Sequence, residues 1–176
     1  MPNKLPAPYI FLESEPGPKM LLEALKWHGT REAVGEADNP VILAWASELK
    51  MREYRSDATA WCGLFMAFVA KRSGKPLPAS PLWARAWLEW GIMSATPKLG
   101  DVLVFWRKGG GGHVGLYVGE DATYYHVLGG NQGDAVSVVR IDKKRLLGAR
   151  DCYKKQPENC RPVWLSAAGP TSTNEA

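Results

Sequence analysis

One cysteine, Cys62, stands where a polar stretch meets an apolar one. Residues 55–59 are polar and turn-like, and after them apolar residues recur at the spacing of one helix face: Cys62, Phe65, Met66 and Val69. At the start of a helix, free backbone N–H groups and the positive end of the helix dipole favour a thiolate. Cysteine is also among the most buried residue types, so core packing is the alternative for Cys62 taken alone.

A histidine, His113, follows a run of four glycines and opens a predicted strand. Apolar residues alternate along residues 113–119, which places His113 and Tyr117 on one face of that strand. A thiol paired with an imidazole, with a polar group to orient the imidazole, is the arrangement that hydrolyses amides through a covalent intermediate. The alternative for His113 alone is a surface histidine on a glycine loop.

The orienting group is expected from residues 129–134, a Gly-Gly-Asn-Gln-Gly-Asp loop. If the strands on either side of Glu120 form a hairpin, the second strand returns beside the start of the first. The stretch from Leu128 to Asn131 then lies next to His113. Asn131 also fits a turn position with positive φ, and His126 is a rival orienting group.

The chain predicts four helices followed by a meander of strands. Helices are expected over 19–28, 40–51, 61–73 and 80–91, and strands over 102–106, 113–119, 123–128, 136–141 and near 149–153. Helices packed on an antiparallel sheet make an α+β domain. Residues 1–18, with five prolines, are expected to be an extended arm, residues 19–165 a single catalytic domain, and residues 166–176 a disordered tail.

Composition excludes several classes of protein. The net charge is +4 and the basic residues are scattered, without the aromatic-studded basic stripe that nucleic acid requires; attraction to an anionic envelope or polymer fits the charge equally well. No apolar run approaches the length of a membrane span, so no integral membrane association is expected. The first residues lack the apolar core of a signal peptide, which predicts synthesis in the cytoplasm without one.

The remaining cysteines, Cys152 and Cys160, have a spacing that would allow a disulfide across a short polar loop. In a protein made in the cytoplasm they are expected to stay reduced, at least initially. No Cys/His spacing indicates zinc, so neither a metal nor a cofactor is predicted.

Together these motifs resemble the papain-like peptidoglycan hydrolases of the CHAP and NlpC-type families. The resemblance extends from about Lys19 to Ala149 and rests on Trp61-Cys62, on Gly100-Asp101-Val102, on residues 112–119 and on residues 128–133. Within these families it is closest to a small phage- and prophage-associated group with the Gly-Gly-Asn-Gln-Gly motif. It implies a papain-like fold and an N-acetylmuramoyl-L-alanine amidase or stem-peptide endopeptidase that acts on bacterial peptidoglycan without a cofactor.

Carried over to this sequence, the resemblance makes Cys62 the nucleophile and His113 the general base. Asn131 falls where CHAP-type enzymes place an orienting asparagine. Those enzymes often carry a glutamate shortly before it, where this chain has glycines, and NlpC-type enzymes often use a histidine near the end of that strand. His126 is therefore the alternative third member.

Candidates for substrate binding are drawn from the same motifs: Trp61, Asp57, Tyr117 and Gln132. For Asp57 a structural role, capping the cysteine helix or holding its approach loop, is preferred. For the aromatic residues core packing is the alternative.

The cellular context follows from the resemblance and the missing signal peptide. A phage endolysin released through a holin pore, a virion-associated enzyme and an antibacterial amidase toxin injected by a secretion system all fit an enzyme that acts on the cell wall, in the periplasm or at the host envelope. Two other classes stay open: a non-catalytic wall- or peptide-binding module on the same scaffold, and a papain-like hydrolase or transferase acting on protein side chains.

Overall fold

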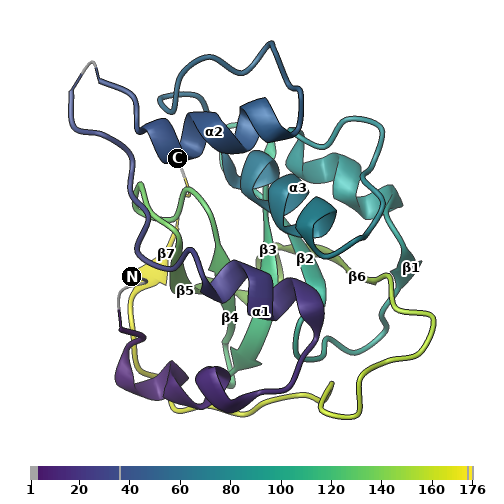
Figure 1. Ribbon diagram of the computed structural model, residues 1–176. Helices are drawn as coiled ribbons and strands as arrows, with labels where there is room; N and C mark the ends of the chain where they lie inside the picture. The colour runs from purple at the N-terminus through teal and green to yellow at the C-terminus, as the bar shows by residue number, and fades with distance from the viewer. Residues whose placement is uncertain (1–3, 36, 174, 176) are drawn as a thin grey trace.

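The computed structural model describes residues 4–35, 37–173 and 175, and it has the predicted α+β architecture. The helices are η1 (Ala7–Ser14), α1 (Lys19–Leu25), α2 (Pro40–Glu48), α3 (Cys62–Arg72), η2 (Ala84–Glu89) and η3 (Lys143–Arg145), of which those marked η are 3-10 helices (Figure 1). Among the described residues, every helix is too short or too polar to cross a lipid bilayer.

Seven strands form one sheet in the order β1-β6-β2-β3-β4-β5-β7. Their bounds are β1 (Ile92–Met93), β2 (Val102–Trp106), β3 (Gly112–Glu120), β4 (Tyr124–Gly129), β5 (Ser137–Asp142), β6 (Leu146–Asp151) and β7 (Thr171–Ser172). The expected antiparallel meander accounts for β2 to β5, whereas β6 crosses back over the sheet and pairs antiparallel with β2. The sheet as a whole is mixed, because β7 pairs in parallel with β5.

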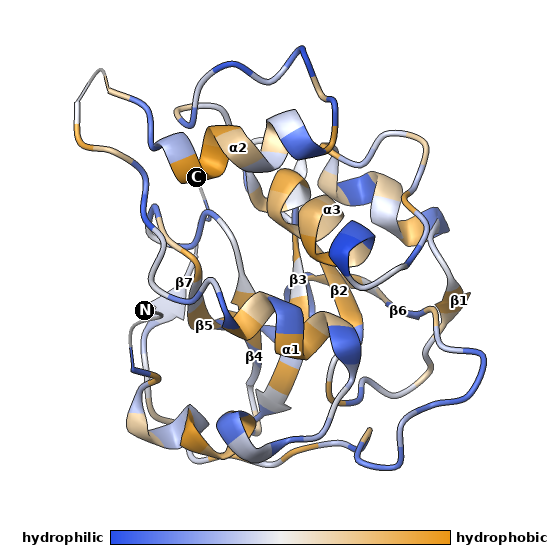
Figure 2. Ribbon diagram, in the orientation of Figure 1, coloured by the Kyte–Doolittle hydropathy of each residue, from blue (hydrophilic) through white to orange (hydrophobic). Residues whose placement is uncertain are grey.

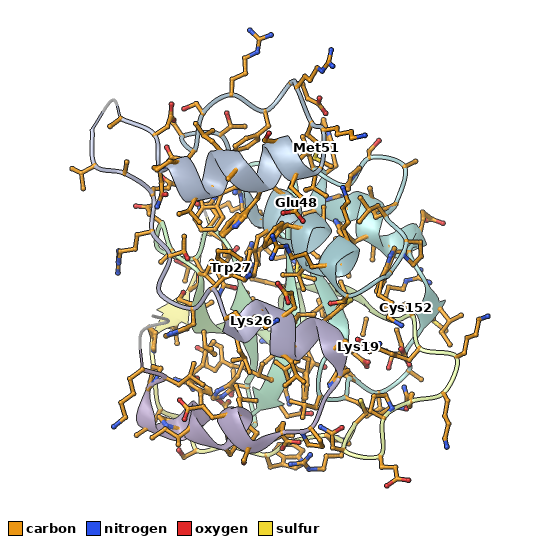
Figure 3. The ribbon with its side chains drawn as sticks, in the orientation of Figure 1. Lys19, Lys26, Trp27, Glu48, Met51 and Cys152 are labelled. Carbon is orange, nitrogen blue, oxygen red and sulfur yellow. The ribbon has the colours of Figure 1, made fainter. Side chains whose placement is uncertain are left out.

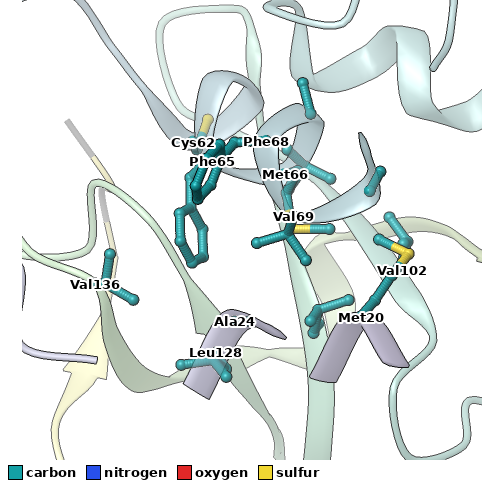
Figure 4. Close-up of a cluster of buried hydrophobic side chains, with 14 of the residues drawn as sticks. Met20, Ala24, Cys62, Phe65, Met66, Phe68, Val69, Val102, Leu128 and Val136 are labelled. Carbon is teal, nitrogen blue, oxygen red and sulfur yellow. The ribbon is translucent and has the colours of Figure 1, made fainter. Parts of the chain in front are cut away.

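The sheet carries an apolar cluster on each face. Along β2, Val102 and Val104 belong to one cluster and Leu103 and Phe105 to the other, as alternation along a strand requires. The larger cluster joins this sheet to α1 and α3, and Cys62 is part of it (Figure 4). The ribbon of β2 and much of α3 are accordingly apolar, whereas the surrounding loops are mainly hydrophilic (Figure 2).

Aromatic side chains hold the three α-helices together. The Trp45 ring of α2 stacks on Phe68 of α3 at 5.3 Å between centroids, and Trp27 meets both rings edge-on. In Figure 3 Trp27 is labelled between α1 and α2. On the outside, Arg72 lies over the Phe68 ring and forms an ion pair with Glu48 at 2.7 Å. These contacts fix the direction of α3 and so the place of its first residue, Cys62.

The segment expected to be a helix over 80–91 is a shorter 3-10 helix, η2. Its buried residues, Ala84, Trp87 and Trp90, are spaced by three, the period of a 3-10 helix. The indole N–H groups of Trp87 and Trp90 donate to carbonyls of the preceding proline-rich segment. That spacing turns Trp83 outward, where it is 71% exposed.

The N-terminal segment is not the extended arm expected for residues 1–18. Prolines are compatible with the first turn of a helix, and the chain forms η1 there, with Tyr9 and Leu12 buried one turn apart. The Tyr9 hydroxyl donates to Nδ1 of His126 at 2.8 Å, which ties this segment to β4. Residues 1–3 of the expected arm lie outside the described residues.

The C-terminal segment is not disordered where the structure describes it. Thr171 pairs with Arg140 of β5, and Glu175 is fully buried in an ion pair with Arg145 at 2.7 Å. Small polar residues do not prevent a backbone from pairing with an open strand edge, which composition alone does not reveal. Residues 174 and 176 of the expected tail lie outside the described residues.

Replacing Gly63 by alanine should destabilise the fold. An added Cβ would lie 2.6 Å from the carbonyl oxygen of Pro81 and closer still to that of Leu82. Overpacking of this kind costs about 1–3 kcal/mol, which outweighs the roughly 1 kcal/mol by which alanine favours a helix. Urea unfolding measures the change. Gly148→Ala is the control, because its Cβ would meet only the flexible end of Leu88; equal stability of both variants would contradict the expected clash.

Asp101 should make stability depend on pH. Burial raises the pKa of Asp101 to about 6, although the hydrogen bonds from Ser94 and from the Lys98 N–H act to lower it. Because the folded state favours the protonated acid, the stability it contributes is present below the unfolded pKa of 3.8 and is lost as pH rises through about 6. Compared with the free energy of unfolding of Asp101→Asn, that of the wild type should fall by about 2–3 kcal/mol between pH 4 and 7. A difference between the two free energies of unfolding that stays constant with pH would refute this.

Candidate active site

Cys62 is the first residue of α3 and lies at the inner wall of a surface cleft. The cleft has a volume of about 380 Å³, and its other walls come from residues before α3, from the segment before η2 and from the glycine loop, among them Tyr54, Trp83, Arg107, Gly111 and Gly112. Cys62 itself is 4% exposed. The thiol therefore belongs to the packed core on one side and to an open cleft on the other.

Two opposing effects act on the thiol of Cys62. Burial raises its pKa, whereas the backbone N–H groups of Val114 and Gly63 and the positive charge of Arg107 lower it. Burial prevails, so the resting group is a neutral thiol rather than the thiolate expected from its place at a helix start. A base that takes the proton during reaction is therefore needed.

The imidazole of His113 is fully buried at the beginning of β3. His113 pairs with Phe105 across the sheet, and its Nε2 lies 2.9 Å from Oε1 of Gln132. Gln132 follows β4, which runs antiparallel to β3. The predicted hairpin thus does bring the loop after β4 beside His113.

The hydrogen bonds of Gln132 determine which nitrogen of His113 carries the proton. The amide nitrogen of Gln132 donates to the carbonyls of Val127 and Ser137, at 3.1 and 2.6 Å. Its oxygen is therefore the group that faces the imidazole, and an oxygen only accepts. Nε2 of His113 must be the N–H donor, which leaves the lone pair of a neutral imidazole on Nδ1.

Nδ1 of His113 is buried and has no hydrogen-bond partner among the described residues. Burial lowers the pKa of His113, although the charge of Glu175 and the hydrogen bond to Gln132 act to raise it. A neutral imidazole with a lone pair and no partner is the resting state of a general base.

Cys62 and His113 approach the start of β3 from different sides. The thiol faces the N–H of Val114. The side chain of His113 lies on the other face of the strand, beside its cross-strand neighbour Phe105. No hydrogen bond joins the thiol to the imidazole among the described residues. Arg107 and Glu175 nevertheless act electrostatically on both groups, so the two share one neighbourhood.

Asn131, the expected orienting residue, does not contact His113. It has φ 57°, and its Oδ1 is buried without a partner among the described residues. It holds the turn that the positive-φ alternative describes. The side chain that is hydrogen-bonded to His113 is that of the next residue, Gln132, which the sequence placed among the substrate-binding candidates.

His126, the alternative third member, is elsewhere in the sheet. It pairs with Gly119, six residues along β3 from His113, or roughly 20 Å at the rise of a strand. Both of its nitrogens are used, by the Tyr9 hydroxyl and by Oδ2 of Asp121 at 2.9 Å. Its hydrogen bonds are therefore made within the fold, away from His113.

The other candidates for substrate binding make hydrogen bonds within the fold. Trp61 is fully buried and its indole N–H donates to Glu32. Asp57 accepts from the backbone N–H groups of Ala33 and Asn39, so it holds the loop before α2 and not, as expected, the start of the cysteine helix or its approach loop. The ring of Tyr117 is fully buried on the far face of the sheet, where its hydroxyl donates to a carboxylate.

One residue of the cleft, Arg107, was not assigned a role from the sequence, whereas Trp83, which also lines it, was a candidate for a groove wall. Arg107 directly follows β2, whose last residue pairs with Gly112, so the register brings it to the glycine loop.

All three cysteines are free thiols, including Cys152 and Cys160. Among the described residues no cluster of three acidic, cysteine or histidine side chains is arranged to hold a metal.

Comparisons with known proteins add no assignment. No family model, no curated protein and no solved structure matches the chain.

The two adjacent amides should respond differently to substitution. Gln132→Leu removes three hydrogen bonds and leaves buried polar groups of Val127, Ser137 and His113 unpaired, at a cost of about 3 kcal/mol or more. Asn131→Gly suits the positive φ and removes an unpaired oxygen, so its stability should change by less than about 1 kcal/mol. Thermal unfolding compares them; equal losses would contradict the assignment of Gln132.

Proposed function

We propose that the protein is a cysteine hydrolase that cleaves an amide bond, with Cys62 as nucleophile, His113 as general base and Gln132 as the residue that orients it. The observation that supports this most strongly is the tautomer that Gln132 imposes. It leaves an unpartnered lone pair on Nδ1 of His113 beside the strand that the Cys62 thiol faces.

The reaction requires Nδ1 of His113 and the Cys62 thiol to come within hydrogen-bond reach, an approach that substrate binding commonly completes in such sites. The Cys62 proton passes to Nδ1, and the sulfur bonds to the carbonyl carbon of the amide. The carbonyl oxygen becomes an oxyanion, which the N–H groups near Cys62 stabilise. The C–N bond then breaks, and the imidazolium of His113 protonates the departing amine.

Water completes the cycle. It transfers a proton to Nδ1 of His113 as its oxygen attacks the thioester carbon, and the C–S bond breaks. The sulfur recovers a proton from the imidazolium, and the other product leaves as a carboxylic acid. Every proton in this sequence moves between Cys62, His113, substrate and water.

The substrate we propose is the stem peptide of bacterial peptidoglycan or its link to muramic acid. The order of the motifs around Cys62, His113 and Gln132 supports this choice, as does the net charge of +4, which suits an anionic polymer. An open cleft with the exposed Trp83 in its wall is also suited to a polymer that carries sugars and peptides.

Purified peptidoglycan tests the proposal, with soluble fragments identified by mass spectrometry. The wild type should release fragments whose masses name the bond, and Cys62→Ala and His113→Ala should each lower the rate at least about a thousandfold. Cys152→Ala and Asn131→Gly are matched controls that should keep the activity, because neither side chain lies at the reacting atoms.

Two results would overturn the proposal. One is release of fragments by a folded Cys62→Ala variant at the wild-type rate. The other is binding of peptidoglycan by the wild type without release of any fragment, which would favour a non-catalytic wall-binding module.

A further inference from the structure

The cleft beside Cys62 contains a guanidinium group with unused hydrogen-bonding capacity. Nη1 of Arg107 donates to the backbone carbonyl of Glu175 at 2.9 Å. Nε of the same side chain is buried and has no partner among the described residues. A buried N–H donor without an acceptor is unfavourable, so an arrangement in which an acceptor reaches it is favoured.

The charge of Arg107 is also unbalanced within the described part of the chain. The nearby carboxylate of Glu175 is engaged by Arg145, which binds both of its oxygens at 2.9 and 2.7 Å. None of the ion pairs between described residues includes Arg107. Arg145 therefore neutralises Glu175, and the charge of Arg107, in the cleft wall, has no ion-pair partner among the described residues.

The surroundings of Arg107 leave room for a ligand. On the neighbouring strand end, Gly111 and Gly112 have no side chains, and Arg85 holds the loop by donating to the Gly111 carbonyl at 2.6 Å. Arg107 is partly exposed and shares the cleft wall with Cys62 and Trp83. Its guanidinium has the planar shape that matches the two oxygens of a carboxylate, and Nη1 is its one nitrogen with a hydrogen-bond partner among the described residues.

We propose that Arg107 binds a free carboxylate that the substrate carries near the scissile amide, so that the site selects acidic peptides over their neutral amides. This inference rests on the proposed function and names its substrate class. The carboxylate would neutralise the unbalanced charge and accept hydrogen bonds from the nitrogens of Arg107 other than Nη1 while the amide lies against Cys62.

A pair of soluble stem-peptide fragments tests the assignment, one with every carboxyl group free and one with every carboxyl converted to a carboxamide. For the wild type, kcat/KM should be at least about tenfold higher with the free acid. Arg107→Gln should lose this preference mainly through KM, and Arg107→Lys should keep part of it, since lysine retains the charge without the fork.

Lys108→Gln is the matched control, because it removes the same charge from the adjacent, exposed position. It should keep the wild-type preference. A merely structural role of Arg107 would lower activity on both fragments equally. An unchanged preference in Arg107→Gln, or none in the wild type, would overturn the proposal.

Binding separates this inference from the proposed function. Calorimetry with Cys62→Ala measures the affinity for the two fragments without turnover, alone and combined with Arg107→Gln. If neither fragment is cleaved by the wild type but the free acid still binds more tightly through Arg107, the carboxylate site stands and the hydrolase proposal fails. If both fragments are cleaved and bound equally, the hydrolase proposal stands and the carboxylate site fails.

Discussion

The side-chain amide of Gln132 is the constraint on which the candidate site depends. It is held by two carbonyls, one on β4 and one on β5, and so its oxygen can face only one way. That orientation makes Nε2 of His113 a donor and Nδ1 a base. The tautomer of the proposed general base is thus determined by the pairing of β4 with β5, and any change in their register would remove this constraint.

The second requirement is a fixed position for the thiol. The aromatic contacts among Trp27, Trp45 and Phe68 set the course of α3, and Gly63 lets its first turn approach the backbone of residues 81–82. Cys62 is thereby brought to the N–H of Val114. The helix layer carries the proposed nucleophile and the sheet the proposed base, and both lie near the start of β3. Burial favours the neutral form of both groups, so the proposed reaction requires proton transfer as it proceeds.

Much of this arrangement is readable from the sequence because it depends on local periodicity. β2 has the predicted bounds, α3 begins within a residue of its predicted start, and the hairpin places the loop after β4 beside His113. What the sequence does not reveal depends on tertiary contacts. Either of two adjacent amides fits the orienting role, and only the turn geometry shows that Gln132 points inward. Burial at every third residue in η2 is close to the spacing of an α-helix, so the sequence pattern fits both kinds of helix. The amino-acid composition of residues 171–172 does not indicate that they pair with β5.

The most direct test of the thiol–imidazole pair is the pH dependence of Cys62 alkylation by iodoacetamide, measured with the other two cysteines replaced by alanine. If His113 is the base, the reactivity should persist below the pH at which an isolated buried thiol ionises, and His113→Gln should lower the rate at pH 7 at least about tenfold while the fold is retained. Identical pH profiles for the two proteins would contradict the account, because Cys62 would then ionise without help from the imidazole.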